Sequence, residues 1–156
     1  MDNVIIFCAK YLIIFVVLIF IWAWLKAPRR LKEQMAAAIV LAGIIAGILD
    51  KIAGKLYYDP RPFVSHHVTP LVSHAADNGF PSEHTILSFT IAAVLYFYRP
   101  KMGYLAFGLA ALVAFGRMAA HVHSPIDIIG GIAIGLVAAV AGNYLAKRLL
   151  AKRRRN

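Results

Sequence analysis

Long apolar runs separated by short polar segments make up most of this 156-residue chain. Each run approaches or exceeds the length that crosses a bilayer core as a helix, which is about 20 residues. The runs cover residues 4–25, 34–53, 82–98, 102–120 and 126–146. The pattern therefore predicts an all-α integral membrane bundle of about five transmembrane helices. No composition shift or repeat divides the chain, so we expect a single domain over residues 1–156.

Small residues recur at four-residue spacing in two of these runs. Gly43 and Gly47 lie in the second run, and Gly131, Gly135 and Ala139 lie in the last. This spacing puts small side chains on one helix face, where backbones of neighbouring membrane helices can approach closely. We expect both faces to be helix contacts.

The composition excludes an ordinary soluble domain. Hydrophobic residues make up 61% of the chain, and the mean hydropathy is +0.71. The only cysteine, Cys8, excludes an intrachain disulfide and is expected to face lipid or to pack. The first run is too long for a cleavable signal and lacks a basic start, so we expect it to remain as a span.

The net charge of +10 could indicate nucleic acid as a partner, but the basic residues lie mostly at the ends of apolar runs. The chain has no nucleic-acid-binding motif, so we expect contact with membrane lipids and not with nucleic acid. Five spans would place the first connection, the third connection and the C-terminus on one face. That face would hold Lys26, Arg29, Arg30, Lys32, Arg99, Lys101, Lys147, Arg148, Lys152, Arg153, Arg154 and Arg155.

Positive charge marks the cytoplasmic side of a membrane protein. The sequence therefore predicts a multi-pass protein of the inner or plasma membrane, with the N-terminus outside and the C-terminus in the cytoplasm. The opposite, extracytoplasmic face would hold three polar segments, residues 59–63, 81–85 and 116–127. We expect these three polar segments to form one site for a phosphate ester at the membrane surface.

Two arginines and a helix start are candidates for binding the phosphate. Arg61 and Arg117 carry planar donor groups that suit phosphate oxygens. Arg117 lies near the end of an apolar run, where an ionisable residue is a functional candidate, although a snorkelling arginine is the alternative. Ser82 opens a helix whose N-terminus favours anions, and it is equally expected as an ordinary N-cap. Glu83 beside it can favour the helix dipole, but a negative charge next to a phosphate site has no evident purpose.

Two histidines can divide the work of phosphoryl transfer. One of His84 and His123 could attack phosphorus while the other protonates the leaving oxygen. Asp127, four residues after His123, could orient that imidazole or could cap the helix that begins after Ser124 and Pro125. The remaining histidines match no metal-ligand spacing and are expected to be solvated in loops: His66, His67, His74 and His121.

Together the three polar segments resemble the signature motifs of the type 2 phosphatidic acid phosphatase superfamily. The family pattern is K-x6-R-P, P-S-G-H and S-R-x5-H-x3-D. The chain has Arg61-Pro62, then Pro81-Ser82-Glu83-His84, then Gly116-Arg117-x5-His123-x3-Asp127. The resemblance implies that His123 becomes phosphohistidine, that Asp127 orients it and that His84 protonates the leaving group. It also implies that Arg61, Arg117 and Ser82 hold the phosphoryl oxygens without a metal or cofactor.

The chain departs from the family pattern at three positions. Gly54 stands where the first motif has lysine, so either Lys55 or Lys51 replaces that lysine or one phosphate contact is missing. Gly116 removes the hydroxyl of the third motif. Glu83 replaces glycine in the second.

The acidic residue of the second motif points to one branch of the family. Glu83 with His84-Thr85, and Arg61-Pro62-Phe63-Val64 in the first motif, are similar to the bacitracin-resistance branch of undecaprenyl diphosphate phosphatases. Glu83, Lys51 and Thr85 are candidates for substrate contact or gating.

The resemblance implies hydrolysis of undecaprenyl diphosphate to undecaprenyl phosphate, with an isoprenoid or phospholipid as the substrate class. One alternative is a phosphatase for phosphatidylglycerophosphate, phosphatidate or lipid A. A second alternative, of another class, is a non-enzymatic lipid transporter or channel that uses the motifs to bind a headgroup.

Overall fold

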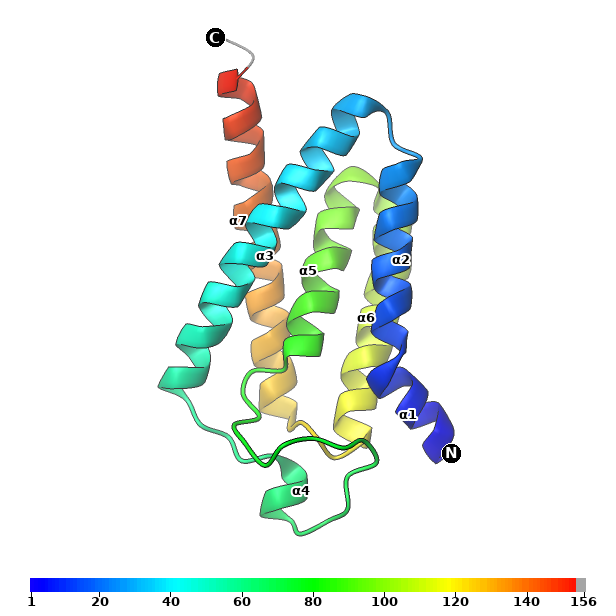
Figure 1. The fold of residues 1–156 in the computed structure, drawn as a ribbon, viewed down its shortest axis with the longest axis vertical. Helices are drawn as coiled ribbons and strands as arrows, with labels where there is room; N and C mark the ends of the chain where they lie inside the picture. The colour runs from blue at the N-terminus through cyan, green and yellow to red at the C-terminus, as the bar shows by residue number, and fades with distance from the viewer. Residues whose placement is uncertain (154–156) are drawn as a thin grey trace.

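The computed structural model describes residues 1–153, and all its regular elements are helices (Figure 1). They are α1 (Asp2–Lys10), α2 (Leu12–Leu25), α3 (Arg29–Leu56), α4 (Pro62–Ser65), α5 (Glu83–Tyr98), α6 (Pro100–Ala119) and α7 (Pro125–Arg153). The predicted all-helical membrane bundle is confirmed. Arg154 and Arg155, which were expected at the basic end, lie outside the described residues.

The first apolar run is not the single straight span that its hydropathy predicts. It breaks at Tyr11 into α1 and α2, which meet at a bend of 43°. Carbonyl groups in the last turn of a helix lack partners within the helix. One of these, Ala9 O in α1, accepts a hydrogen bond from Arg117 Nη1 at 3.3 Å. The bend therefore gives a buried cation on α6 a backbone acceptor.

The other four predicted runs correspond to helices. Those predicted at residues 34–53 and 126–146 are longer than expected and form α3 and α7. Within residues 1–153, α3, α6 and α7 are long and apolar enough to cross a membrane, and the bent α1–α2 pair would make a fourth span. Helix α5 has only 16 residues and lies among the others, with nine of them buried. The count of five spans therefore stays a prediction.

Small residues bring α3, α5 and α7 together, but only one of the two predicted faces does so. A Cβ atom added at Gly131 or Gly135 would come within 2.9 Å of α5, which confirms close packing by this face. A Cβ added at Gly142 would lie 2.5 Å from the backbone nitrogen of Ala42 on α3. In contrast, a Cβ at Gly43 or Gly47 would meet nothing within 4 Å, so the prediction for these two glycines is wrong.

Helix α3 packs against α7 through the face next to that of Gly43 and Gly47, on which Ala38, Ala42 and Ala46 are buried. One residue along a helix corresponds to a turn of about 100°. Gly43 and Gly47 therefore point away from α7.

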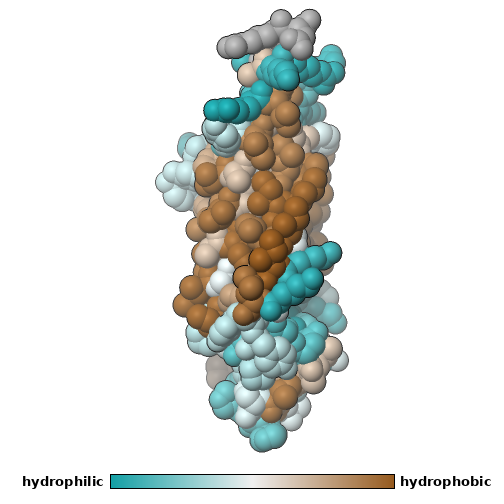
Figure 2. All heavy atoms as spheres, turned by 90° about the vertical axis from the view of Figure 1, so that its left-hand side faces the viewer, coloured by the Kyte–Doolittle hydropathy of each residue, from teal (hydrophilic) through white to brown (hydrophobic). Residues whose placement is uncertain are grey.

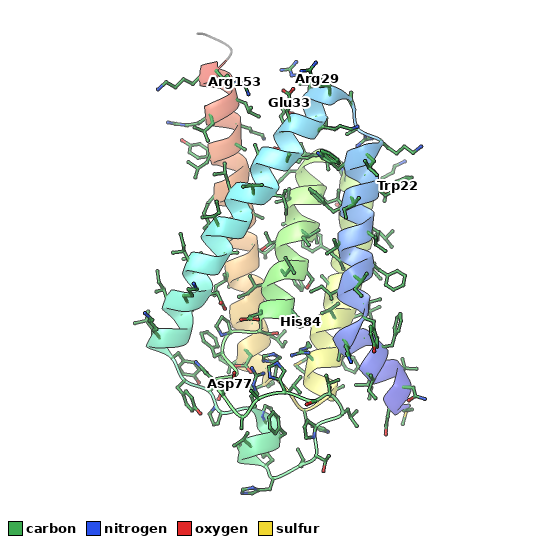
Figure 3. The ribbon with its side chains drawn as sticks, viewed as in Figure 1. Trp22, Arg29, Glu33, Asp77, His84 and Arg153 are labelled. Atoms are coloured by element: carbon green, nitrogen blue, oxygen red, sulfur yellow. The ribbon has the colours of Figure 1, made fainter. Side chains whose placement is uncertain are left out.

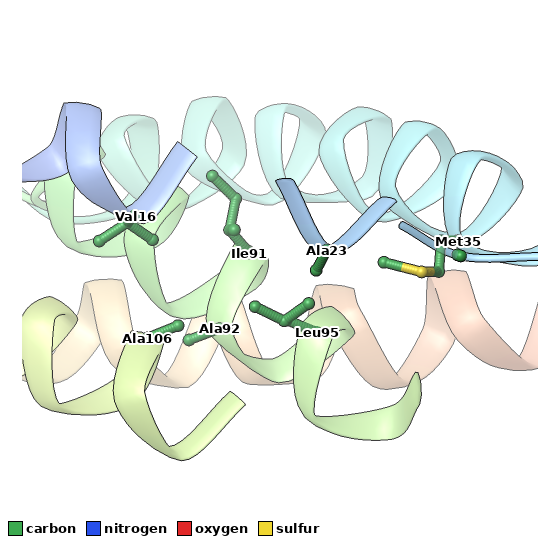
Figure 4. Packing of buried hydrophobic residues seen from close by; sticks show 8 residues of the cluster. Val16, Ala23, Met35, Ile91, Ala92, Leu95 and Ala106 are labelled. Atoms are coloured by element: carbon green, nitrogen blue, oxygen red, sulfur yellow. The ribbon is translucent and has the colours of Figure 1, made fainter. Parts of the chain in front are cut away.

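The interior holds mostly small and aliphatic side chains, while large apolar side chains cover the outside. One core cluster joins α2, α3, α5 and α6 (Figure 4), and its labelled members are Val16, Ala23, Met35, Ile91, Ala92, Leu95 and Ala106. Residues such as Ile44, Phe115 and Val140 are more than half exposed. On the face that Figure 2 shows, hydrophobic residues cover the middle of the molecule and hydrophilic residues lie toward both ends. This distribution is typical of a surface that faces lipid.

The two ends of the bundle differ as the charge pattern predicts. The connections α2–α3 and α5–α6 lie at the same end as the last turns of α7, and Arg99 Nη2 donates to Lys26 O at 3.4 Å across them (Figure 1). Arg29 and Arg153 lie at this end, whereas Asp77 and His84 lie toward the other (Figure 3). The three polar segments therefore gather at the end opposite the basic residues, although which end faces the cytoplasm stays a prediction.

Candidate active site

The connection between α6 and α7 presents His123 to the interior of the bundle. Asp127, in the first turn of α7, accepts hydrogen bonds at Oδ2 from His123 Nδ1 at 3.1 Å and from Ser124 N at 2.8 Å. Asp127 N in turn donates to Ser124 Oγ at 3.4 Å. Both sequence interpretations of Asp127 therefore hold, because a single carboxylate oxygen caps the helix and orients the imidazole.

This arrangement determines which nitrogen of His123 is free to react. With Nδ1 donating to the carboxylate, Nε2 carries a lone pair. Nε2 lies 3.4 Å from Arg61 Nη1 and 3.3 Å from Arg117 Nη2, and guanidinium groups can only donate. Burial lowers the pKa of His123, the hydrogen bond to Asp127 opposes that shift, and the two arginines add to it. The result is a neutral imidazole with its unprotonated nitrogen beside two cations.

Arg61 is held in place by three groups of the protein. It lies at the start of α4 and is only 5% exposed. Its Nε donates to Asp77 Oδ1 at 2.7 Å, Nη1 to Val122 O at 2.9 Å and Nη2 to Asn78 O at 3.3 Å. The hydrogen bond from Arg61 lowers the pKa of Asp77, so this carboxylate stays ionised. The guanidinium is thus oriented before any ligand binds.

Arg117 is equally buried, at 2% exposed, so the alternative of a snorkelling arginine is wrong. Its Nη1 donates to Ala9 O, and its Nη2 contacts His123 Nε2. Its Nε is buried and has no hydrogen-bond partner within residues 1–153. A buried donor without an acceptor costs about 1–3 kcal/mol. An oxyanion in the site would supply that acceptor.

Asn78 organises the long loop between α4 and α5. Its side-chain nitrogen donates to Gly54 O at 2.9 Å and Tyr57 O at 3.0 Å, at the end of α3. Its side-chain oxygen accepts from Asp59 N at 2.9 Å and Phe80 N at 3.0 Å. One amide therefore ties the end of this loop to α3 and to the α3–α4 connection, which is a role that the sequence motifs did not reveal.

A cavity of about 340 Å³ opens beside His123, a size typical of small-molecule sites. Predicted residues that line it are Lys51, Arg61, Glu83, His84, Arg117 and His123. It is also lined by His74 and Asp77, which were not predicted, and by Asp50. His84 comes from the first turn of α5, so the three polar segments converge on one site.

Four other predicted residues do not line this cavity. Ser82 is fully buried at the start of α5; its N donates to Asp127 O at 3.2 Å, and its Oγ accepts from Thr85 Oγ1 at 3.1 Å. Thr85 is buried against Gly131. Asp127 lies behind His123. Lys55 is exposed outside the cavity, so of the two candidate lysines only Lys51 lines it.

A second, apolar groove of about 240 Å³ adjoins the polar cavity between α3 and α5. Asp50 and Glu83 line both spaces and therefore lie at their boundary. Away from that boundary the groove is lined by Gly43, Ala46, Gly47, Ile86, Leu87 and Thr90. The two glycines that make no helix contact thus leave open space beside the site.

The glycine in place of the motif serine has a structural reason. A Cβ added at Gly116 would lie 2.7 Å from Ala9 N and 2.8 Å from Cys8 Cβ, so the α1 backbone occupies the place of a side chain. A hydroxyl group at this position would point at α1. The close approach also lets Arg117 reach Ala9 O.

The other histidines behave differently from one another. His66, His67 and His121 are exposed and line no part of the cavity, as expected for loop histidines, whereas His74 lies inside it. Within residues 1–153 no group of three or more histidine, cysteine, aspartate or glutamate side chains is placed to hold a metal ion.

Comparison with known families gives the same answer as the motifs. The family model of the PAP2 superfamily matches residues 32–150, which include all three polar segments. The chain belongs to the PAP2 superfamily. This confirms the family inferred from the motifs.

Relatives cover most of the chain. It is 33% identical to the bacitracin transport permease protein BcrC of Bacillus licheniformis over 96% of this chain and 73% of that protein. It is 31% identical to the undecaprenyl-diphosphatase BcrC of Bacillus subtilis (strain 168) over 88% of this chain and 70% of that one. The crystal structure of Aquifex aeolicus LpxE superposes with a TM-score of 0.68 at 24% identity, covering 90% of this chain and 81% of that chain, and supports the fold. Family and relatives together support a lipid phosphatase.

Replacing Gly116 by serine would restore the family motif, yet we expect it to damage this protein. The added side chain must displace α1, which costs about 1–3 kcal/mol and weakens the contact of Arg117 with Ala9. Thermal unfolding in detergent should show a lower midpoint for Gly116→Ser, with reduced turnover. Gly108→Ser on the same helix is the matched control, because nothing lies within 4 Å of a Cβ there. A Gly116→Ser protein that is as stable as the wild type and more active would contradict this explanation.

Proposed function

We propose that this chain removes the terminal phosphate of an isoprenyl diphosphate in the membrane, with undecaprenyl diphosphate as its substrate. The observation that carries the proposal is the free Nε2 of His123, which lies between two buried arginines in a cavity that adjoins an apolar groove. A nucleophile among cations suits a phosphoryl group, and an adjoining apolar space suits a lipid. A transporter or channel would not need a carboxylate that orients an imidazole for nucleophilic attack.

In the first step, Nε2 of His123 attacks the terminal phosphorus, and the bond to the bridging oxygen breaks. The proton on Nδ1 stays on the hydrogen bond to Asp127, whose carboxylate stabilises the positive charge that develops on the ring. Arg61 and Arg117 stabilise the charge on the non-bridging oxygens. His84, across the cavity on α5, takes up a proton when the negatively charged diphosphate binds and donates it to the departing lipid phosphate.

In the second step, water attacks the phosphohistidine. His84, now neutral, takes a proton from the water as the new P–O bond forms and the P–N bond breaks. The products are orthophosphate and His123 with its Nε2 lone pair restored. Each step needs only a nucleophile, a proton carrier and fixed positive charge, all of which line the cavity.

The cavity and groove also fit the two parts of the substrate. Lys51 lines the cavity next to Asp50 and is the cation available for the second phosphate of a diphosphate. The isoprenoid tail would leave past Asp50 and Glu83 into the groove beside Gly43 and Gly47. A monophosphate lipid such as phosphatidate would leave Lys51 without an anion.

The charge distribution favours an active site on the extracytoplasmic face. The basic residues at the other end of the bundle mark the cytoplasmic side. Undecaprenyl diphosphate would then enter the groove from the outer leaflet.

The His123→Ala variant should lose orthophosphate release from undecaprenyl diphosphate by at least about 1,000-fold, because no other group can form the phosphoenzyme. The measurement is phosphate release by purified protein in detergent. A chelator should leave wild-type turnover unchanged and orthovanadate should inhibit it. His66 is an exposed loop histidine, so His66→Ala is the control and should behave as wild type.

Unchanged turnover in His123→Ala would reject the mechanism. Phosphatidylglycerophosphate, phosphatidate and lipid A offered beside the isoprenoid test the substrate. A strong preference for any of these lipids would reject the isoprenoid assignment.

Filling the groove should affect long substrates only. A leucine side chain at Gly47 would occupy the space proposed for the tail, and losing the burial of a few methylene groups costs about 1.5–3 kcal/mol, or about 10- to 100-fold in kcat/KM. We expect this loss for undecaprenyl diphosphate and no loss for dimethylallyl diphosphate, which is too short to reach the groove. Gly108→Leu is the matched control on α6. Equal losses for both substrates would show that the groove does not hold the tail.

A cysteine at Thr69 tests the orientation, because this exposed residue lies in the loop next to the site. In a Cys8→Ala background, Thr69→Cys should react with an impermeant maleimide on intact cells. Ala151→Cys, near the end of α7, should react only after permeabilisation. The reverse labelling pattern would overturn the proposed topology.

A further inference from the structure

His74 lies in the active-site cavity without a role in the mechanism above. It comes from the loop between α4 and α5, outside the three polar segments. Its ring centre is 6.1 Å from that of His123, and the two planes meet at 76°. The ring nitrogens of His123 contact Arg61, Arg117 and Asp127 instead, so His74 does not orient His123.

The nitrogen Nδ1 of His74 is buried and has no hydrogen-bond partner within residues 1–153. The charged groups that influence the pKa of His74 include Arg61, Arg117 and Asp77. Arginines cannot accept a hydrogen bond, and the carboxylate of Asp77 already accepts one from Arg61 Nε. None of these three groups therefore serves Nδ1 as an acceptor.

The protonation state of His74 follows from the same surroundings. Burial lowers the pKa of His74, and Arg61 and Arg117 lower it further. At neutral pH the ring is therefore neutral, with one N–H donor and one lone pair. A neutral donor in a cavity lined by two arginines is suited to an anion, because the anion supplies the acceptor that Nδ1 lacks.

We propose that His74 contacts the phosphoryl group during transfer, donating a hydrogen bond from Nδ1 to a non-bridging oxygen. A phosphoryl group bonded to His123 Nε2 would occupy the cavity that His74 also lines, so His74 can act as a third donor beside Arg61 and Arg117. His84 keeps the separate task of exchanging a proton with the leaving oxygen and with water. This inference rests on the proposed function for its lipid substrate, but the anion contact can be measured without that lipid.

Two substitutions separate a donor from a packing residue. His74→Leu removes the N–H while filling a similar volume, and His74→Asn places an amide N–H near the position of Nδ1. His66→Leu, in the same loop but outside the cavity, is the matched control. Thermal unfolding in detergent confirms that each variant is folded.

We expect His74→Leu to lower kcat about 100-fold, as for loss of one donor to a reacting oxyanion, with little change in KM. Inhibition by orthovanadate, which mimics the five-coordinate phosphorus, should weaken by a similar factor. His74→Asn should recover most of both, and His66→Leu should match the wild type.

Wild-type kcat and vanadate inhibition in His74→Leu would overturn the proposal. Equal losses in His74→Leu and His74→Asn would also overturn it, since they would show that the ring only packs. Binding of orthovanadate to lipid-free protein, followed by ⁵¹V NMR, tests the contact independently of the substrate. If no lipid diphosphate is hydrolysed by the wild type, the proposed function fails while this binding test still decides the role of His74.

Discussion

Two guanidinium groups converge on one imidazole nitrogen, and the rest of the site serves to hold them there. Arg61 and Arg117 are buried and each lies within 3.4 Å of His123 Nε2, with no carboxylate between them. Like charges this close repel each other strongly wherever water is excluded. The protein offsets the repulsion with backbone carbonyls of Val122, Asn78 and Ala9 and with one carboxylate at the rim. The phosphoryl group of the proposed substrate would complete the compensation.

Helix packing and site geometry depend on the same small residues. Gly116 lets α1 approach α6 so that Ala9 O meets Arg117, and Gly131 lets α5 approach α7 so that Ser82 N meets Asp127 O. A larger side chain at either position would separate the helices that carry the catalytic groups. The chain therefore joins its three polar segments through close backbone contacts as well as through side-chain bonds such as the one from Arg61 to Val122 O.

Much of the fold and the centre of the site could be predicted from sequence, because hydropathy and motif spacing report on local chain properties. The apolar runs predicted the long helices, and the three motifs predicted that His84, His123 and the two arginines meet. The break at Tyr11 and the roles of Gly43 and Gly47 depend on which face meets a neighbour, and spacing alone does not contain that information.

The loop residues are a harder case. Asn78, Asp77 and His74 act through contacts with segments far away in the sequence, and His74 resembled its exposed neighbours His66 and His67. Only Lys51, one helical turn before Gly54, could have been preferred over Lys55 from periodicity, because a residue three positions back shares a helix face.

The acidic residue of the second motif is best understood from its position between two environments. Glu83 and Asp50 line both the polar cavity and the apolar groove, with Lys51 beside them. A lipid diphosphate must place its most highly charged end among the arginines and its tail among apolar residues, with a boundary between the two. With the proposed substrate, carboxylates at that boundary would repel the phosphate groups from the groove and favour the direction in which the headgroup enters the cavity. Glu83 also lies near enough to Arg117 to reduce the net positive charge while the cavity is empty. Its negative charge beside a phosphate site is therefore consistent with guiding the headgroup, because it acts at the exit and not at the reacting phosphorus.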